Sequence, residues 1–256
     1  MSAGTTADPL LQPIRDHTQL PDKDNVPVRN SFENWQSELL SESLMPVLWQ
    51  RHPDGSFFVG HDVGIYWRDT DPPQKGVKAP DWYYVPGVPR LVGGEMRRSY
   101  VLPLELMPPY LVLEYVSDDG AEERDRTPWE GKFWVYEHMI RPAFYGIYEP
   151  DSGKLEMHRH VEDRFEDLRP NERGRYELPS LGVELGIWEG TYHGYAMPWL
   201  RWWDSRGVLL PSPQDALEAE RQRAEAERQR AEAERQRADK LAERLRALGI
   251  NPDEVS

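Results

Sequence analysis

The stretch that decides the fold is PYLVLEYVS, Pro109–Ser117. Its apolar side chains follow one another almost without a break, and Glu114 is the one charged residue among them. Such a run is typical of a strand in the middle of a sheet that is covered on both faces. The segment therefore predicts a central, buried strand with other elements packed around it.

Strand and helix patterns lie on both sides of this segment. Runs rich in aromatic and β-branched residues predict further strands; they cover residues 56–67, 82–85, 143–150, 154–160, 181–192 and 198–210. A helix is expected from Ser31, which stands as an N-cap before apolar residues at helical spacing. A second helix is expected over 127–140, with Thr127 as its N-cap and Pro128 at the first helical position. These elements predict an α/β (α+β) domain.

The two ends of the chain differ from this middle part. Residues 1–30 are polar, proline-rich and aperiodic, which predicts a flexible arm. Residues 31–213 form the expected folded domain. From 214 to 256 the heptad AEAERQR repeats, and its strong helix formers and Glu–Arg pairs predict a long, mostly solvated helical tail. Only its end, Ala238–Leu248, has apolar residues at both core positions of a coiled coil, which leaves self-association of the tail open.

The composition restricts the classes of function. The 256 residues include 31 Lys+Arg and 45 Asp+Glu, for a net charge of −14. Contacts to phosphates need cationic side chains, so this charge argues against nonspecific binding of nucleic acid, unless carboxylates hold a cation that reverses the local charge. The absence of cysteine excludes disulfides and thiolate metal sites. No apolar run approaches the ~18 residues of a membrane span, and no signal-peptide pattern is present. We expect a soluble, cytoplasmic protein that does not enter a membrane.

Two carboxylates lie where a carboxylate is energetically costly. Asp81 follows Pro80 and directly precedes the strand WYYV, and Glu114 lies inside the central apolar strand. A buried, ionised carboxylate needs a cation, hydrogen bonds or a raised pKa. A hard divalent cation with oxygen ligands meets that need. A glutamate that pairs with a core arginine, or that faces water at a strand end, is the alternative.

Lys132 is the third candidate. It lies in the expected helix after Glu114, and Tyr136, four residues further on, shares its helix face. If the helix packs back on the sheet, this lysine comes near Glu114, where it would orient a water molecule or neutralise charge on a phosphate. A surface lysine that pairs with Glu130 or Glu137 is the alternative.

The order of these motifs resembles the "putative restriction endonuclease" family of Uma type, a branch of the PD-(D/E)xK nuclease superfamily. Pro80-Asp81 resembles the family's PD, and Glu114 in LVLEYVS resembles its strand acid. The other matching positions are Ser117, Asp125, Lys132 and Tyr136, and the segments 180–190 and 200–213. The resemblance covers residues 44–213. Lysine usually stands two residues after the strand acid in this superfamily, and that position is Val116 here.

The resemblance implies a restriction-endonuclease-like fold with a central mixed sheet flanked by helices. It implies that Asp81 and Glu114, with the backbone carbonyl of Tyr115, bind Mg²⁺, or Mn²⁺ as an alternative. It further implies that Asp81, Glu114 and Lys132 are the catalytic residues of an endonuclease that hydrolyses DNA. A homodimer is expected, because two sites cut both strands of a duplex most readily.

Other interpretations of the sequence remain open. His158 and His160 would face the same side of a strand and offer two ligands for Zn²⁺ or Mn²⁺. The cluster of Trp199, Trp202 and Trp203 would fill a core, or would form a stacking platform for a base or for a sugar in a carbohydrate enzyme. A catalytically inactive, nuclease-fold scaffold that assembles through its helical tail is the main rival to an active nuclease.

Overall fold

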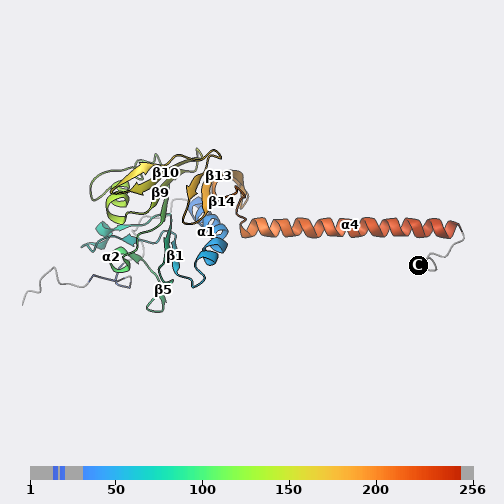
Figure 1. Cartoon of the computed structure of the whole chain (residues 1–256), viewed down its shortest axis with the longest axis horizontal. Coiled ribbons are helices and arrows are strands. Elements are labelled where there is room, and N and C mark those ends of the chain that lie inside the picture. Colours follow the sequence, from blue (N-terminus) through green and yellow to red (C-terminus); the bar gives the residue numbers. More distant parts are fainter. Residues whose placement is uncertain (1–13, 17, 21–30, 249–256) are drawn as a thin grey trace, which may run out of the picture. The chain divides into compact units, whose positions relative to one another are not determined.

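The computed structural model describes residues 14–16, 18–20 and 31–248 (Figure 1). The chain divides into two compact units, Met1–Leu210 and Pro211–Ser256. The first unit contains the sheets and all but one of the helices, and the second contains the long C-terminal helix. Each unit is described separately below.

A mixed sheet of six strands forms the centre of the first unit. In sheet order the strands are β1 (Phe57–Gly60), β4 (Trp82–Pro86), β8 (Leu111–Tyr115), β9 (Phe144–Glu149), β10 (Lys154–Val161) and β11 (Arg164–Asp167). Neighbouring strands are antiparallel except for β8 and β9, which are parallel. The predicted central strand is β8, and all five of its residues are buried. The α+β fold with a mixed central sheet is therefore confirmed.

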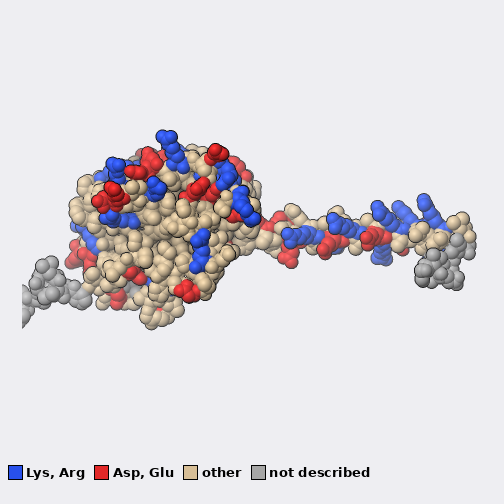
Figure 2. Space-filling view, viewed as in Figure 1, with Lys and Arg blue, Asp and Glu red and all other residues tan. Residues whose placement is uncertain are grey.

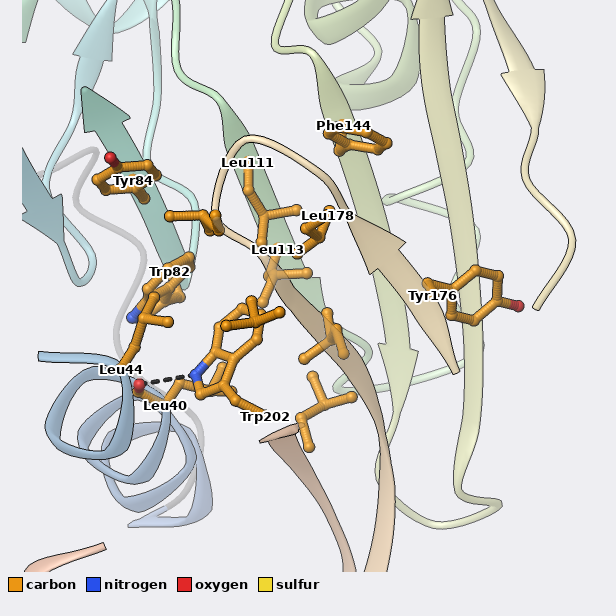
Figure 3. Close-up of a cluster of buried hydrophobic side chains, with 14 of the residues drawn as sticks. Leu40, Leu44, Trp82, Tyr84, Leu111, Leu113, Phe144, Tyr176, Leu178 and Trp202 are labelled. Carbon is orange, nitrogen blue, oxygen red and sulfur yellow. Dashed lines mark hydrogen bonds between the residues drawn. The ribbon is translucent and has the colours of Figure 1, made fainter. Parts of the chain in front are cut away.

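One face of this sheet is covered by α1 (Ser31–Arg51) and a three-stranded antiparallel sheet. The strands of that second sheet are β12 (Tyr176–Leu178), β13 (Val183–Tyr192) and β14 (Tyr195–Asp204). Leucines of α1 and indoles from both sheets fill the space between the layers, as Figure 3 shows around Trp82 and Trp202. The Trp202 indole N–H donates to the Leu40 carbonyl at 2.8 Å, so this tryptophan satisfies its polar atom inside the core.

The opposite face carries a short helical segment and a small sheet. The helical segment consists of α3 (Lys132–Val135) and the π-helical turn η3 (Tyr136–Ile140). The small sheet has the strand order β3 (Val77–Lys78), β2 (Ile65–Tyr66) and β7 (Tyr100–Val101). The remaining elements of this unit are η2 (Pro73–Gly76), β5 (Leu91–Val92), β6 (Glu95–Met96) and α2 (Leu102–Glu105). Aromatic side chains, including Tyr83, Phe133 and Tyr145, fill this second core.

The helix expected over 127–140 is shorter than predicted, and the expected N-cap is wrong. Trp129 has a left-handed backbone, with φ of 70°, which interrupts any helix that begins at Thr127. The Thr127 hydroxyl instead donates to the Asp125 carboxylate at 2.6 Å. The helix begins at Lys132, with Gly131 as its N-cap. Lys132 is therefore the first helical residue rather than one turn inside.

Part of the expected flexible arm is held against the small sheet. Leu20 is buried beside Tyr66, Val77 and Val101. Arg15 donates to the Asp69 carboxylate from Nε at 2.8 Å. Residues 14–16 and 18–20 of the expected arm therefore include side chains that contact the folded unit, and the rest of residues 1–30 lies outside the described residues.

The repeat-containing tail forms α4 (Pro213–Ala247), as its composition predicts. The Ser212 hydroxyl accepts from the Asp215 amide, and the Asp215 carboxylate accepts from the Ser212 amide, which together make a capping box. Glutamine side chains donate to glutamates one turn earlier, for example Gln229 to Glu225 at 3.1 Å. No residue of α4 is buried, and basic and acidic side chains alternate along it (Figure 2).

Candidate active site

The pairing of two strands brings Asp81 and Glu114 together. Antiparallel β4 and β8 pair Trp82 with Leu113 and Tyr83 with Val112. One step further along this register, Asp81 lies opposite Glu114. Residues directly opposite on antiparallel strands project from the same face, with Cβ atoms about 5 Å apart. The two acids therefore meet on the face of the sheet that α3 and η3 cover.

Glu114 is almost completely buried, with 1% of its surface exposed. The Tyr136 hydroxyl donates to its Oε1 at 2.6 Å, and the Lys132 ammonium donates to its Oε2 at 3.1 Å. Burial raises the pKa of Glu114 above its ordinary value, although Lys132 and Tyr136 act in the opposite direction. The predicted convergence of Lys132 and Tyr136 on this strand acid is thus seen in the structure.

Asp81 is fixed by the neighbouring strand and by α1. Its Oδ2 accepts from the Tyr115 backbone amide at 2.5 Å. The Ser37 hydroxyl of α1 lies 3.1 Å from both the Asp81 carbonyl oxygen and the Tyr115 hydroxyl. Burial, and then the negative charge of Glu114, raise the pKa of Asp81 well above its ordinary value. The two carboxylates therefore form a partly desolvated pair that resists double ionisation.

Lys132 contacts three carboxylates rather than one. Besides Glu114, its ammonium lies 3.2 Å from Glu122 Oε1 and 3.4 Å from Glu123 Oε1. Burial alone would lower the pKa of Lys132, but Glu114, Glu123 and Glu122 together raise it, which keeps the ammonium charged. The sequence interpretation missed both additional acids, because they lie in a run of polar residues (118–126) where nothing distinguishes a buried glutamate from a solvated one.

A second lysine near this site was also missed. The Lys78 ammonium donates to the backbone carbonyl of Glu130 at 2.7 Å. Burial lowers its pKa, and the charge of Lys132 lowers it further, whereas Glu114 acts in the opposite direction. Lys78 stands three residues before Asp81, and this short spacing is the signal that could have identified it.

The other family-like positions have structural environments of different kinds. The Asp125 carboxylate accepts from the amide and hydroxyl of Thr127, and its backbone carbonyl accepts from the Trp134 amide at 3.3 Å. Asp125 therefore organises the loop before Lys132. Val116 packs against the aromatic core, and Ser117 is exposed.

The carboxylate pair suits a hard divalent cation by its chemistry. Asp81 and Glu114 supply oxygen ligands, and burial raises the pKa of both, so a bound cation would favour their ionised forms. Among the residues that the structure describes, no group of three or more His, Cys, Asp or Glu side chains has the arrangement of a metal site. Two carboxylates are nevertheless within the usual complement for Mg²⁺, which commonly retains several waters and adds substrate phosphates.

The two other predicted sites are absorbed into the fold. His158 Nδ1 lies 3.0 Å from Asp167, and His160 Nε2 lies 2.8 Å from the Glu137 carbonyl. Both rings contact Phe165, which confirms that they share one face of β10. Trp199, Trp202 and Trp203 are all buried, so they fill a core and do not form an exposed stacking platform.

The site thus has an aspartate before one central strand and a glutamate near the end of its neighbour, as in the PD-(D/E)xK pattern, with the lysine on the next helix instead of two residues after the glutamate. Residues 25–194, more than half of the chain, match the family model of Uma2, described as "putative restriction endonuclease". The chain belongs to this family.

The chain was also compared with solved structures and with curated proteins. The chain is similar to a crystal structure described as that of "a putative nuclease belonging to DUF820" from Anabaena variabilis, with 16% identity, a TM-score of 0.41, and coverage of 60% of this chain and 76% of that one. No curated protein matches the chain significantly. Within the described residues, no helix combines the length and the apolar character that crossing a membrane requires.

Proposed function

We propose that this protein is a metal-dependent endonuclease that hydrolyses DNA phosphodiester bonds. The observation that carries the proposal is the pair of carboxylates, Asp81 and Glu114, opposite each other on β4 and β8 with the Lys132 ammonium on one of them. Membership of a restriction-endonuclease family supports the same reaction class. Asp81, Glu114 and Lys132 are the proposed catalytic residues.

Asp81 and Glu114, with the Tyr115 carbonyl, would hold Mg²⁺ or Mn²⁺. Such a cation, when bound, lowers the pKa of a coordinated water and neutralises charge on the phosphate. The protein contributes orientation: the Tyr115 amide fixes one oxygen of Asp81, and Tyr136 fixes one oxygen of Glu114. The Tyr136 hydroxyl also favours the ionised form of Glu114, because it donates to the carboxylate, and this offsets part of the effect of burial.

Lys132 would hold positive charge beside the reacting phosphate. Its ammonium stays protonated because the surrounding carboxylates raise its pKa. It is therefore suited to neutralise phosphate charge, and unsuited to accept a proton from water at neutral pH. This assigns to Lys132 an electrostatic role that does not depend on its position two residues after the acid.

DNA is the proposed partner despite the net charge of −14. On the face shown in Figure 2, cationic and anionic side chains are interspersed over the first unit. A cation between Asp81 and Glu114 would convert the most negative part of the site into one that attracts phosphate. We expect the active form to be a homodimer, so that two sites reach both strands.

Cleavage of supercoiled plasmid DNA in Mg²⁺ or Mn²⁺ tests this function. We expect nicked and linear products from the wild type, and none from Asp81→Asn or Glu114→Gln. Lys132→Met should lose about 10²–10³-fold in rate, as expected for removal of one preorganised charge. Lys154→Met and Glu166→Gln change exposed side chains of β10 and β11 and serve as controls that retain activity.

Metal binding can be measured without reference to activity. Mn²⁺ should raise the unfolding temperature of the wild type, because a ligand that binds only the folded state stabilises it. Asp81→Asn should lose this response. If folded protein cleaves no DNA over a range of Mg²⁺ and Mn²⁺ concentrations, the inactive binding or scaffold module becomes the better assignment.

A further inference from the structure

A row of aromatic rings joins the residue after β2 to the loop and helical segment that carry Lys132. Trp129 lies between two other indoles, with ring centroids 6.2 Å from Trp67 and 4.9 Å from Trp134. His138 stacks on Trp134 at 4.8 Å, with an interplanar angle of 8°. We call these four residues, Trp67, Trp129, Trp134 and His138, the aromatic ladder.

Trp129 is placed where packing alone does not explain it. Half of its surface (51%) is exposed, whereas Trp67 beneath it is only 6% exposed. Its φ of 70° is strained for a bulky side chain, and sparsely populated backbone conformations of this kind cluster at functional sites. The chain thus accepts a conformational cost and still leaves a large apolar ring in contact with water.

Cationic groups accompany the exposed ring. The Arg68 guanidinium lies 4.1 Å from the ring centroid of Trp67 and 5.5 Å from that of Trp129. The Lys78 ammonium binds the carbonyl of Glu130, the residue after Trp129. An exposed aromatic ring with an Arg guanidinium over it, and a Lys between it and the carboxylate pair, is a combination suited to single-stranded nucleic acid, through base stacking and phosphate contacts.

The ladder adjoins the proposed catalytic site along the chain and through the Lys78 contact. Trp129 precedes Lys132 by three residues, and Trp134 and His138 belong to the same helical segment as Lys132 and Tyr136. Lys132 and Tyr136 contact Glu114, whereas Trp134 and His138 lie on the other side of the helix and are partly exposed. Trp129, three residues before Lys132 in the chain, is the ring that links the ladder to the carboxylate pair, and a nucleotide that follows the bound phosphate would contact the ladder there.

We propose that the aromatic ladder binds an unpaired nucleobase, and that the substrate of this nuclease is DNA with a single-stranded segment next to the cleaved bond. The part of this inference that concerns cleavage rests on the proposed nuclease function, and the part that concerns binding of an unpaired base does not. Bases inside a duplex already stack on both faces, so only an unpaired base offers a free face to Trp129. An overhang, a flap or an unpaired gap satisfies this requirement, and an intact duplex does not.

Binding of fluorescein-labelled DNA to the full-length protein, measured by anisotropy without divalent metal, tests the proposal. A 20-nucleotide single strand should bind more tightly than the duplex of the same sequence. Trp129→Ala should weaken single-strand binding about 5- to 100-fold, the range for loss of one base–aromatic stack. Duplex binding should change by less than twofold. The dependence of single-strand affinity on salt should not change, because stacking releases no counterions.

Trp49→Ala is the matched control. Trp49 is 42% exposed and has the Arg90 guanidinium 5.2 Å from its ring, but it lies on α1 outside the ladder. The Trp49→Ala substitution should leave the affinity for single-stranded DNA unchanged. Trp129→Phe retains an aromatic ring and should retain most of the affinity, which separates stacking from any collapse of the loop. Circular dichroism confirms that each variant is folded.

The proposal fails if single strand and duplex bind equally, or if Trp129→Ala and Trp49→Ala have the same effect. These outcomes are independent of hydrolysis. Plasmid cleavage that depends on Asp81, together with binding that ignores Trp129, would reject the ladder and leave the nuclease assignment intact. Trp129-dependent binding by a protein that cleaves nothing would support the ladder and reject the hydrolase.

Discussion

At the scale of single residues, the site depends on two carboxylates that face each other across neighbouring strands. Asp81 and Glu114 lie opposite each other on β4 and β8, and the Lys132 ammonium contacts Glu114. Burial raises the pKa of both carboxyls, and the charge of Glu114 raises that of Asp81 further, so their neutral forms are favoured. Such an arrangement reduces the stability of the folded protein at neutral pH, and a bound cation would relieve it.

This destabilisation predicts a pH-dependent effect of Asp81→Asn. The pKa of folded Asp81 lies above its ordinary value of 3.8, so the stability that this group contributes is present below about pH 3.8 and is lost as pH rises through the raised pKa. Without metal, Asp81→Asn should therefore be more stable than the wild type by about 1–4 kcal/mol at pH 8. The difference should shrink towards pH 4.

Urea unfolding at several pH values between 4 and 8 measures this difference. Asp163→Asn, at a 90% exposed side chain, should show no such trend. A wild-type protein that is the more stable of the pair at pH 8 would contradict the proposed charge repulsion.

Tyr136→Phe should shift the pH dependence of cleavage. The buried Tyr136 hydroxyl donates to Glu114 and lowers the pKa of that carboxyl, so its removal should raise this pKa. The acidic limb of the pH–rate profile should then move to higher pH, because the ionised carboxylate is the form that binds a cation. Loss of the donor should also cost about 1–3 kcal/mol of stability.

Tyr148→Phe provides the comparison for this experiment. It removes a hydroxyl that donates to the Pro198 carbonyl on the face of the sheet opposite to Glu114, so it does not touch that carboxylate. It should reduce stability without moving the pH profile. An unchanged acidic limb in Tyr136→Phe would mean that Glu114 ionisation does not limit the reaction.

At the scale of elements, the loop before α3 determines where Lys132 lies. A Cβ atom on Gly131 would lie 2.3 Å from the Asp125 carbonyl oxygen, so the loop closes only with glycine at this position. Gly131→Ala should cost about 1–3 kcal/mol through overpacking and should reduce cleavage, because Lys132 is the next residue. Urea unfolding and plasmid cleavage measure the two effects.

Gly93→Ala is a suitable reference, because a Cβ there meets nothing within 4 Å and only its φ of 61° is strained. It should cost about 1 kcal/mol or less and leave cleavage unchanged. Equal losses in the two variants would show that close packing of Gly131 on Asp125 contributes nothing.

The sequence predicted strands better than it predicted this loop. The apolar run around Glu114 identified the central strand, and spacing of four residues placed Lys132 and Tyr136 on one helix face, which the contacts to Glu114 confirm. Both signals are local and periodic. The left-handed Trp129 and the contact of Glu123 with Lys132 depend on packing between distant segments. The polar stretch of residues 118–131 has no periodic pattern from which such packing could be predicted.

At the scale of the whole molecule, the C-terminal end of α4 carries an apolar seam. Leu241 and Leu245 lie in the last turns of α4 and Leu248 is its C-cap residue; Leu241 and Leu248 are 60% and 75% exposed. We expect this seam to pair two copies of the chain in a concentration-dependent dimer. Leu241→Glu combined with Leu245→Glu should abolish the dimer in sedimentation velocity experiments.

Leu217→Glu is the control for this prediction. Leu217 is 50% exposed and lies near the beginning of α4, where glutamates occupy the neighbouring core positions. It should leave the sedimentation coefficient unchanged. A wild type that stays monomeric at all concentrations would exclude pairing through the tail.

The parallel and antiparallel neighbours of β8 have a consequence for how the site opens. β8 is paired with β4 along Leu111–Leu113 and with β9 along its whole length, so we expect its amides to exchange with solvent only when the sheet opens. The acidic loop of residues 118–131 lies outside any ladder, so we expect its amides to exchange faster. Local opening of this loop would change the contacts of Lys132 with Glu122 and Glu123 and leave Glu114 in its place in the sheet.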